Sequence, residues 1–316
     1  MTLAELTKNP PVGSIVCPAM TTPVYDRVVN NTTTMNKNKI PKIIHISFTS
    51  RCVPTEVFAD GIQRWKDELP EYSVYYHDDA AVDRLMDADW PEFPNLHRVM
   101  KCIKYKGAMK VDLWRMLAIY KYGGIYTDVD NIPTKNFRNG AAILPEDTFF
   151  SSSDGSDRPN QNVFAMEPKH PIALFTIETI LLNLSYMQSI RKPKLVWTTG
   201  PAAFREGYRK YQRLMCPRCE EGQLLSEGVF PGDKRRDTKG FKQIHKEKNW
   251  NWGNPVGGEI VEWKGFNVTK KERASSIGGT NHWEKLIYWN RTGEDYSCRD
   301  YLSALDQKTI TEDWAL

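Results

Sequence analysis

The stretch YKYGGIYTDVDN, residues 120–131, places two acidic side chains, Asp128 and Asp130, one residue apart after a short apolar run. Apolar residues at helical spacing come before it and predict a helix over residues 104–124 that ends at a double glycine. The run after the glycines predicts a strand, residues 125–130, with both acids at its carboxyl end. In a parallel sheet, that end of a strand is where ligands bind.

The other predicted elements alternate between strands and helices. The helix before the acids has one apolar stripe, formed by Met109, Leu113, Met116, Leu117 and Tyr120. We also expect strands at 39–50 and 72–79, a helix at 58–69, a strand–turn–helix unit at 162–184, and a strand end, Gly-Pro turn and helix at 196–211. This order indicates an α/β protein with a parallel nucleotide-binding sheet. Residues 1–39 lack periodicity and predict an irregular arm.

Composition and charge narrow the functional class. Of the 316 residues, 40% are apolar and 26% are charged, which is ordinary for a globular protein. The formal net charge of +4 suits an anionic ligand such as a nucleotide phosphate, and no zinc-finger, basic-zipper or RNA-recognition pattern indicates nucleic acid. No apolar run is long enough to predict a transmembrane helix. The basic run 234–248 is either a solvated face or a contact with phospholipid headgroups or an acidic acceptor.

Cysteines and glycosylation triplets leave the compartment open. Six cysteines, enough for three disulfides, stand at positions 17, 52, 102, 216, 219 and 298. The CPRC stretch, residues 216–219, has no second Cys/His pair to complete a zinc site, so a disulfide or two reduced thiols is preferred. Five N-x-[ST] triplets, at Asn30, Asn31, Asn183, Asn267 and Asn290, permit a Golgi or secretory lumen. The first thirty residues show no apolar signal region, which favours the cytoplasm unless an anchor was removed from a longer precursor.

Two carboxylates at a strand end predict a divalent cation site. Mg²⁺ and Mn²⁺ prefer carboxylate, water and phosphate oxygens as ligands. Two anions at this spacing repel each other, and a bound cation would offset the repulsion. The alternative is a solvated acidic turn, which is the commoner meaning of an isolated D-x-D. His45, in the first predicted strand, is expected to be a core residue rather than a ligand.

Asp112 and Arg115 stand three residues apart on the predicted helix and share one face. As a plain surface ion pair they would contribute about 0.3 kcal/mol to stability. The hairpin of helix, double glycine and strand could instead bring this face near Asp128 and Asp130. There an arginine could hold a diphosphate through paired N–H groups, and an aspartate could accept hydrogen bonds from sugar hydroxyls.

The segment VDLWRMLAIYKYGGIYTDVD, residues 111–130, resembles the signature of the DXD-containing glycosyltransferases of family 32. That group includes fungal initiating mannosyltransferases and sphingolipid mannosyltransferases, and the catalytic domains of the large clostridial glucosylating toxins share its pattern. Eight positions match at the family's spacing: Asp112, Arg115, Tyr120, Gly123, Gly124, Tyr126, Asp128 and Asp130. An isoleucine stands where the family usually has leucine before Tyr120.

Weaker similarity extends over about residues 40–290. The segment IPKIIHISF, residues 40–48, is similar to the family's first strand, and Phe48 would take the place of an aromatic residue near the nucleotide base. The segment NVFAMEPKHP, residues 162–171, resembles the family segment that carries an asparagine near the donor sugar. Asn162 would therefore occupy that place.

The C-terminal part departs from the family pattern. TNHW…W, residues 280–289, is similar to the family's terminal His-His-…-Trp element, but Asn281 replaces the first histidine and Trp289 comes later than usual. Of the tail tryptophans, only Trp283 or Trp289 is expected at the site. TTGP, residues 198–201, matches a Thr-Gly-Pro turn of the family.

The resemblance implies a GT-A fold, in which a mostly parallel, nucleotide-sugar-binding sheet is flanked by helices and carries helical acceptor-side insertions. After the arm at 1–39, residues 40–316 would form a single glycosyltransferase domain. Its nucleotide-binding half would be residues 40–135. Residues 136–316 would supply the acceptor half and the C-terminal tail.

A metal site follows from the same resemblance. Asp130 would coordinate Mn²⁺, or Mg²⁺, directly. Asp128 would bind the ribose or reach the metal through water. Asn281 or His282, from the tail, would complete the metal shell.

The implied reaction moves a hexose from GDP-mannose or a UDP-hexose to a hydroxyl of a glycan, lipid or protein acceptor. Asp112 would grip hydroxyls of the donor sugar, Arg115 would hold the diphosphate or sugar, and Asn162 would lie beside the anomeric carbon. The family retains anomeric configuration, and the motif offers no obvious carboxylate nucleophile, so we favour front-face attack by the acceptor hydroxyl. Similarity to the fungal group favours mannose.

Two other functions compete with this interpretation. A phosphatase of the haloacid dehalogenase type also has D-x-D after an apolar strand, but it has Thr or Val where this chain has Ile132, and it lacks the helix–Gly-Gly lead-in. A sugar-binding or nucleotide-sugar-binding module without turnover is the second alternative. Arg115, Asp128 and Asp130 argue against it, whereas the changed position Asn281 favours it.

Overall fold

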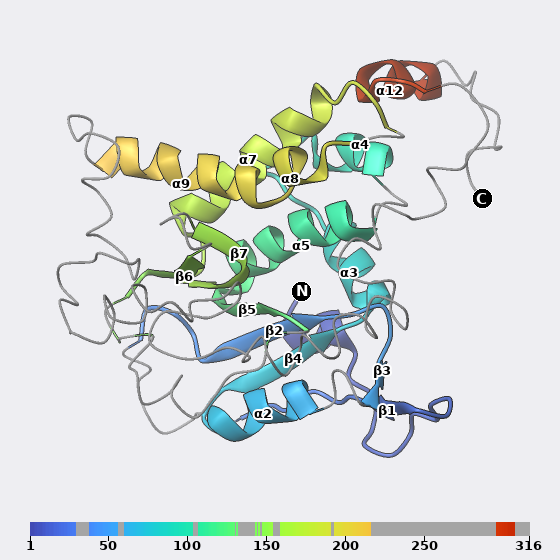
Figure 1. The fold of residues 1–316 in the computed structure, drawn as a ribbon, viewed down its shortest axis with the longest axis vertical. Coiled ribbons are helices and arrows are strands. Elements are labelled where there is room, and N and C mark those ends of the chain that lie inside the picture. The colour runs from blue at the N-terminus through green and yellow to red at the C-terminus, as the bar shows by residue number, and fades with distance from the viewer. Residues whose placement is uncertain are drawn as a thin grey trace, which may run out of the picture.

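The structure, a computed structural model, describes residues 1–29, 38–55, 60–103, 107–129, 131, 143, 145, 147–153, 159–190, 193–215 and 295–306. These residues form a central sheet with helices on both faces, a small two-stranded ribbon and a C-terminal helix (Figure 1). Several predicted features lie outside them: Asp130, Asn281, His282, Trp283, Trp289, the CPRC stretch and the basic run 234–248.

The central sheet confirms the predicted α/β class. Its strands are β2 (Ile43–Ser47), β4 (Ser73–His77), β5 (Gly124–Asp128), β6 (Phe149–Ser153) and β7 (Pro159–Met166). Within the described residues their order is β4-β2-β5-β7-β6. β2 is parallel to β4 and β5, whereas β7 is antiparallel to β5 and to β6. All strands except β7 therefore run in one direction, as predicted for a mostly parallel sheet.

Helices cover both faces of this sheet. They are α2 (Asp60–Glu68), α3 (Asp79–Met86), α4 (Leu96–Met100), the 3₁₀ turn η2 (Lys101–Ile103), α5 (Gly107–Tyr122), α7 (Pro171–Ser185), α8 (Leu195–Thr198) and α9 (Pro201–Met215). Figure 1 shows α2 on one side of the sheet and α5, α7 and α9 on the other. The buried apolar side chains accordingly form two separate clusters, one on each face.

Side-chain alternation assigns each strand residue to one of these clusters. Ile44 and Ile46 of β2 and Ile125 of β5 belong to the cluster on the α2 face. His45 and Tyr126, which are register partners in β2 and β5, point to the opposite face, under α5. Polar side chains at these alternate positions therefore meet α5 rather than solvent.

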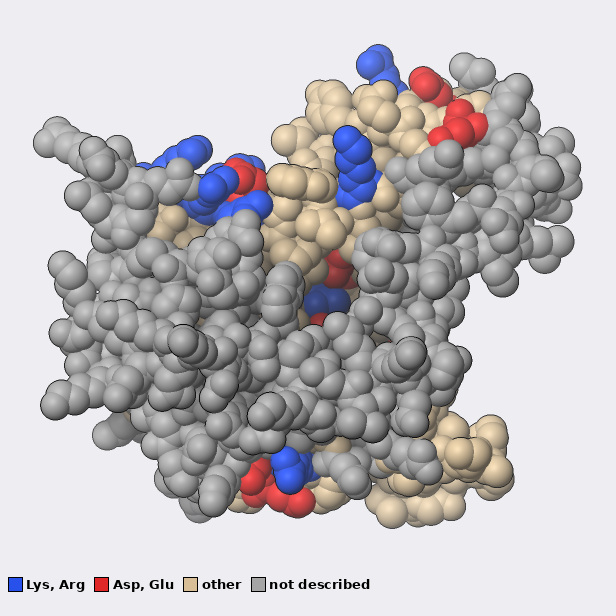
Figure 2. Space-filling view, in the orientation of Figure 1, with Lys and Arg blue, Asp and Glu red and all other residues tan. Residues whose placement is uncertain are grey.

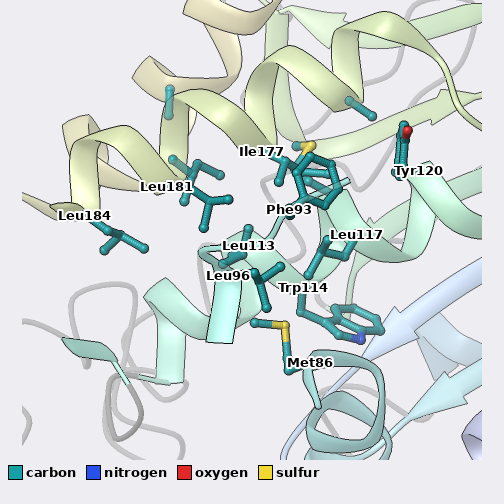
Figure 3. Packing of buried hydrophobic residues seen from close by; sticks show 14 of the residues in the cluster. Met86, Phe93, Leu96, Leu113, Trp114, Leu117, Tyr120, Ile177, Leu181 and Leu184 are labelled. Atoms are coloured by element: carbon teal, nitrogen blue, oxygen red, sulfur yellow. The ribbon is translucent and has the colours of Figure 1, made fainter. Parts of the chain in front are cut away.

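α5 is buried on all sides. The predicted stripe residues are buried, and so are Asp112, Trp114, Arg115, Ala118 and Ile119. Figure 3 shows Leu113, Leu117 and Tyr120 of α5 in one cluster with Ile177 and Leu181 of α7. The prediction of a single apolar stripe is therefore wrong, because α7 and its neighbours form a further layer over the side that a surface helix would expose.

Gly123 and Gly124 make the turn from α5 into β5. Both have positive φ, +64° and +96°, which side chains other than glycine rarely adopt. A Cβ at Gly124 would lie 2.6 Å from the backbone oxygen of Ile43, and one at Gly123 would lie 2.7 Å from Cδ of Pro168. The turn predicted from the double glycine is confirmed, and it lets β5 approach β2 closely.

The N-terminal segment is more regular than predicted. It contains α1 (Leu3–Thr7) and β1 (Thr21–Pro23), and β1 pairs antiparallel with β3 (Cys52–Pro54). A disulfide joins Cys17 to Cys52. The prediction of an irregular arm is wrong for these elements, because five- and three-residue segments are too short to show a hydrophobic period.

α8 replaces a predicted strand end. Its sequence, LVWT, reads as a strand because Val, Trp and Thr favour strands. The side-chain nitrogen of Asn183 on α7 instead donates to the backbone oxygens of Trp197 and Thr198, 3.0 and 3.2 Å away, and satisfies the end of a short helix. This nitrogen is the one that a glycan would modify in the Asn183 triplet, and it is already engaged here.

The C-terminal helix α12 (Cys298–Asp306) is fastened to the domain. A disulfide joins Cys298 to Cys102 of η2, and the Cys298 amide donates to the backbone oxygen of Met187, 2.8 Å away. Among the helices that the structure describes, none is long and apolar enough to cross a membrane.

Candidate active site

Arg115 lies at the centre of a buried polar cluster at the carboxyl end of β5. Its Nη1 is 3.1 Å from Oδ1 of Asp128, and its Nη2 is 3.1 Å from Oδ1 of Asp112. Nη1 also donates to the backbone oxygen of Gln161, 2.9 Å away. The hairpin of α5 and β5 therefore brings the Asp112–Arg115 face to Asp128. Because Asp112 and Arg115 are buried, they do not form a plain surface ion pair. Figure 2 shows basic and acidic side chains at the bottom of a recess near the middle of one face.

Asp112 is held by three donors. Its Oδ1 accepts from Nε2 of Gln161 at 2.8 Å as well as from Arg115, and its Oδ2 accepts from the hydroxyl of Thr199 at 2.9 Å. Burial raises the pKa of Asp112 to about 6, although Arg115 and the hydrogen bond from Thr199 act to lower it. At pH 7 the carboxylate is therefore mostly ionised, and the guanidinium balances its charge.

The charge of Arg115 is permanent. Burial acts to lower the pKa of this guanidinium, but Tyr126, Asp128 and Asp112 outweigh burial and raise it. The guanidinium carbon also lies 4.5 Å from the centroid of the Tyr126 ring, which is a cation–π contact. Its Nε–H has no hydrogen-bond acceptor among the described residues, so the group is not saturated by this part of the protein.

Asp128 binds its partners in the described part of the chain through one of its two side-chain oxygens. Tyr126, two residues earlier and on the same face of β5, donates its hydroxyl to Oδ1 of Asp128 at 2.6 Å, where Arg115 also binds. Burial raises the pKa of Tyr126 well above its usual value, so the phenol stays a donor. No described residue bonds to Oδ2 of Asp128, whose side chain is 33% exposed.

This arrangement fits a divalent cation at Asp128. A carboxylate oxygen without a protein donor, on a partly exposed side chain, is the kind of ligand that Mg²⁺ and Mn²⁺ prefer. One guanidinium faces two carboxylates, which leaves a formal charge of −1 for a cation to balance. The described residues contain no group of three or more His, Cys, Asp or Glu side chains that could hold a metal by themselves. The predicted ligands Asp130, Asn281 and His282 lie outside this part of the chain.

A bulge in β7 directs Gln161 toward the cluster. The β6–β7 register contains the pairs Ser151–Phe164 and Ser153–Pro159, so two steps along β6 correspond to five along β7. Such an irregularity interrupts the alternation of side chains and can aim one at a site. Gln161 consequently reaches the buried arginine with its backbone oxygen and the buried aspartate with its side chain.

Asn162 and Phe48 lie close to this edge of the sheet. The backbone oxygen of Asn162 accepts from the side-chain nitrogen of Asn131 at 2.9 Å. Phe48 directly follows Ser47, the register partner of Asp128, and packs against the apolar cluster on the α2 face. Both side chains are half-buried. Their roles beside the anomeric carbon and the nucleotide base stay predictions.

Two buried histidines lie under α5 next to this cluster. Nδ1 of His45 is 3.1 Å from Nε2 of His77, and Nε2 of His45 is 3.0 Å from the backbone oxygen of Gly123. Because a carbonyl only accepts, His45 carries its proton on Nε2 and accepts one from His77. Burial lowers the pKa of His45 to about 4 and that of His77 well below its usual value. The expectation that His45 is a core residue is confirmed.

Sequence reasoning missed three partners of the cluster. Gln161 depends on a bulge, which no feature of the sequence signals. Thr199 belongs to the TTGP turn, which the family resemblance marks without assigning its hydroxyl a partner. The bond from Tyr126 could have been found, because residues two apart on a strand share a face.

Comparison with known families gives this geometry a context. Residues 55–150 match the family described as "Glycosyltransferase sugar-binding region containing DXD motif". The matched region includes α5 and β5, and with them Asp112, Arg115 and Asp128. The remaining partners, Gln161 and Thr199, come from later segments.

Curated relatives point to the same enzyme class. Mannosyl phosphorylinositol ceramide synthase CSH1 of Saccharomyces cerevisiae is 24% identical over 216 residues, which cover 68% of this chain and 54% of the relative. Initiation-specific alpha-1,6-mannosyltransferase of Candida albicans is 29% identical over 92 residues, which cover 29% of this chain and 21% of the relative. The chain thus spans about half, or less, of the length of the curated relatives it matches.

One solved structure also aligns with this chain. The PaToxG Glycosyltransferase matches 83% of this chain and 87% of its own, with 15% sequence identity and a TM-score of 0.41.

Proposed function

We propose that this chain, a glycosyltransferase with a DXD sugar-binding region, moves a hexose from a nucleotide sugar to an acceptor hydroxyl with the help of a divalent cation. One observation carries most of this proposal: Arg115 bridges Asp112 and Asp128 at the carboxyl end of β5, inside the matched region. The mostly parallel sheet supports the GT-A assignment, since its ligands would meet this same edge.

Asp128 would hold the cation, together with the predicted ligands Asp130, Asn281 and His282. When bound, the cation stabilises negative charge on the departing diphosphate as a Lewis acid. The chain's own contribution is to fix the Asp128 carboxylate. Tyr126 and Arg115 both bind its Oδ1, which leaves Oδ2 without a partner among the described residues.

Arg115 supplies a fixed positive charge at the place where the leaving group develops negative charge. Breaking the sugar–phosphate bond leaves negative charge on the nucleoside diphosphate. A guanidinium that Asp112, Asp128 and Gln161 already hold in position needs no reorganisation when that charge appears. Asp112 and Thr199 would act mainly by holding this arginine in place.

Front-face attack by the acceptor hydroxyl fits these carboxylates best. Asp112 is buried and bonded to three donors, and the remaining oxygen of Asp128 is the one that we assign to the cation, so we do not assign either carboxylate as the nucleophile. The acceptor oxygen would form its bond to the anomeric carbon as the bond from that carbon to the diphosphate oxygen breaks. The acceptor proton would pass to the departing phosphate oxygen. A covalent sugar–protein adduct trapped during turnover would contradict this route.

The names of the relatives favour mannose as the donor sugar. One is a mannosyl phosphorylinositol ceramide synthase and another an alpha-1,6-mannosyltransferase. GDP-mannose is therefore the first donor to test, with UDP-hexoses second. A glycan or lipid acceptor is consistent with the same names.

A donor hydrolysis screen tests the proposal. The purified chain is incubated with Mn²⁺ and a panel of GDP- and UDP-sugars, beside Asp128→Asn, Asp130→Ala and the control Asp87→Asn, an exposed aspartate away from the cluster. We expect one donor to release nucleoside diphosphate, with the release lost in the Asp128 and Asp130 variants and with a chelator but kept in the control. Release that survives the chelator and both substitutions would disprove the metal site, and a chain that neither hydrolyses nor binds any donor by calorimetry would disprove the function.

A further inference from the structure

A pocket of about 400 Å³ opens between the C-terminal end of α7 and the short helix α8. This volume lies in the range of small-molecule sites. Its lining includes Tyr186 and Gln188 after α7, Asn183 within α7, and Lys194 and Trp197 at α8. None of these residues belongs to the cluster around Arg115.

Two aromatic side chains of this lining are left in water. Trp197 is 65% exposed and Tyr186 is 70% exposed, and Leu182 and Val196 beside them are exposed as well. Scattered apolar residues on a surface need no explanation, but a group of them around one pocket indicates a binding site. Trp and Tyr present flat apolar faces with a polar edge. Such faces match a sugar ring, whose C–H groups are apolar and whose rim carries hydroxyls.

Polar groups around the aromatic pair are free to meet those hydroxyls. The Asn183 side-chain nitrogen is committed to the backbone of α8, which turns its Oδ1 away, and no described residue donates to that oxygen. Lys194 is exposed and has no ion-pair partner in the described part of the chain. Gln188 is exposed and uses only its nitrogen, in a local bond to the backbone oxygen of Tyr186. The lining of the pocket thus combines hydrogen-bond acceptors and donors with two aromatic side chains.

One wall of the pocket is bonded to α5, the helix that carries Arg115, and the other wall is connected to η2, which precedes α5 in the chain. The α8 wall continues into Thr199, whose hydroxyl binds Asp112 of α5 at 2.9 Å. The α7 wall is bonded through Met187 to Cys298, and the disulfide from Cys298 to Cys102 fastens it to η2, on the N-terminal side of α5. The pocket is therefore held at a fixed position relative to the cluster.

We infer that this pocket binds a sugar ring of the acceptor, stacked on Trp197 and hydrogen-bonded to Asn183 and Lys194. The inference rests on the proposed function, because only a glycosyltransferase has an acceptor to place. A concave site with hydrogen-bonding groups suits a glycan better than a membrane surface, which would meet a flat apolar face. The ligand class is a hexose-containing glycan or the sugar headgroup of a glycolipid.

The test compares Trp197→Ala with Trp197→Phe, which keeps an aromatic face, and with Val16→Ala, an exposed residue of the N-terminal segment. Three quantities are measured: donor hydrolysis without acceptor, the acceptor KM with methyl α-mannoside and α-1,6-mannobiose, and saturation-transfer NMR signals of those two sugars. We expect Trp197→Ala to raise the acceptor KM by about tenfold or more and to abolish the NMR signal, with donor hydrolysis unchanged. Trp197→Phe should stay near wild type, as should Val16→Ala.

The outcomes separate this inference from the proposed function. An unchanged acceptor KM and NMR signal in Trp197→Ala would overturn the sugar site. If the wild type neither hydrolyses nor binds any donor, the proposed function fails, and the NMR signal alone then decides: a sugar signal lost in Trp197→Ala supports the site, and its absence in the wild type overturns it. Binding of the wild type to phospholipid vesicles that Trp197→Ala loses, without any sugar signal, would overturn the site in favour of a membrane surface.

Discussion

Two buried arginines, Arg51 and Arg115, each bridge two aspartates, yet they have different uses in this protein. Arg51 lies 3.1 Å from Asp26 and 3.6 Å from Asp78. Arg115 lies 3.1 Å from each of its two aspartates. The side chains of both arginines are almost completely buried, so burial and charge alone do not distinguish them.

The remaining partners of Arg51 belong to the backbone and the N-terminal segment. Its Nη groups donate to the backbone oxygens of Thr7, Val24 and Tyr76 and to Oδ1 of Asn9. Asp78 is committed as well, because it caps α3 by accepting from the amide of Ala81 at 2.8 Å. Arg51 therefore joins the N-terminal segment to the sheet, and the Asp26 oxygen that lacks a partner in the described residues, Oδ2, is buried away from any ligand.

Arg115 has a single backbone acceptor, the oxygen of Gln161, and its Nε has none in the described residues. Among the described residues, the Asp128 carboxylate accepts from two side chains through Oδ1, its Oδ2 has no partner, and the side chain is partly exposed. The same ion-pair chemistry is thus structural where backbone oxygens bind the guanidinium and the unpaired carboxylate oxygen is buried. Where an oxygen is left facing the surface, it is suited to a ligand.

The largest expected effect is the loss of folding stability when Arg51, the structural arginine, is replaced. Removing one member of a buried charge network leaves its partners unpaired, so Arg51→Met should lower the free energy of unfolding by about 3–5 kcal/mol. The matched control is Arg98→Met, which removes an exposed pair with Asp306 and should lose less than about 1 kcal/mol. Urea unfolding followed by circular dichroism measures both. Equal, small losses in the two variants would show that Arg51 does not hold the N-terminal segment.

The second-largest expected effect is a loss of turnover when Arg115 is replaced. Lysine keeps the charge but has no planar fork to span two carboxylates, so Arg115→Lys should lower kcat by about 10²–10³-fold, or roughly 3–4 kcal/mol. Its loss of folding stability should be smaller than that of Arg51→Met, because Asp112, with a pKa of about 6, can take up a proton when its partner moves. Steady-state kinetics and urea unfolding on the same sample test both points. A stable variant with normal kcat would remove Arg115 from the mechanism.

The half of the site that the sequence predicted is local. Asp112, Arg115 and Asp128 lie in one hairpin of α5, two glycines and β5, so helix periodicity, a glycine turn and strand direction suffice to place them together. The sheet class followed for the same reason, since each strand and helix has its own apolar pattern. The first strand and the helix before the acids were both found from such patterns.

The other half of the site is formed by residues from distant segments, and no sequence pattern predicts their contacts. Gln161 reaches the cluster only through a bulge in β7, and Thr199 reaches it through a short helix whose sequence favours a strand. The Arg51 network joins segments as far apart as Thr7 and Tyr76. Hydrogen bonds between distant segments depend on tertiary packing, which no local period encodes.

Acidification should act on the Arg115 cluster through Asp112. Below pH 6 Asp112 takes up a proton and Arg115 loses one counter-charge, so kcat/KM should fall by up to about tenfold per pH unit below that value. Unfolding should not be the cause at this residue: its folded pKa, about 6, exceeds the usual 3.8, so protonation of Asp112 favours the folded state as the pH falls through this window. His45 has the opposite sign, because its pKa is lowered from 6.5 to about 4 and the unfolded state binds the proton first.

A pH profile of kcat/KM, with unfolding free energies at the same pH values, separates these terms. Asp112→Asn should lack the limb near pH 6 if the limb belongs to this carboxyl. A limb that persists in Asp112→Asn would assign it to another group.

The smallest expected effect comes from removing the Thr199 hydroxyl, which is compared with removing the hydroxyl of its neighbour Thr198. Thr199→Val removes one hydrogen bond from Asp112 and should reduce stability by about 1 kcal/mol. Because this bond favours the ionised carboxylate, its loss should also move the acid limb of kcat/KM to higher pH. Thr198→Val is the matched control, since its hydroxyl donates to the backbone oxygen of Lys194 at 2.9 Å and touches no titrating group of the cluster. If the two variants lose equal stability but only Thr199→Val shifts the acid limb of kcat/KM, the hydrogen bond from Thr199 sets the pKa of Asp112. If the acid limb lies at the same pH in both variants, Thr199 contributes only to packing.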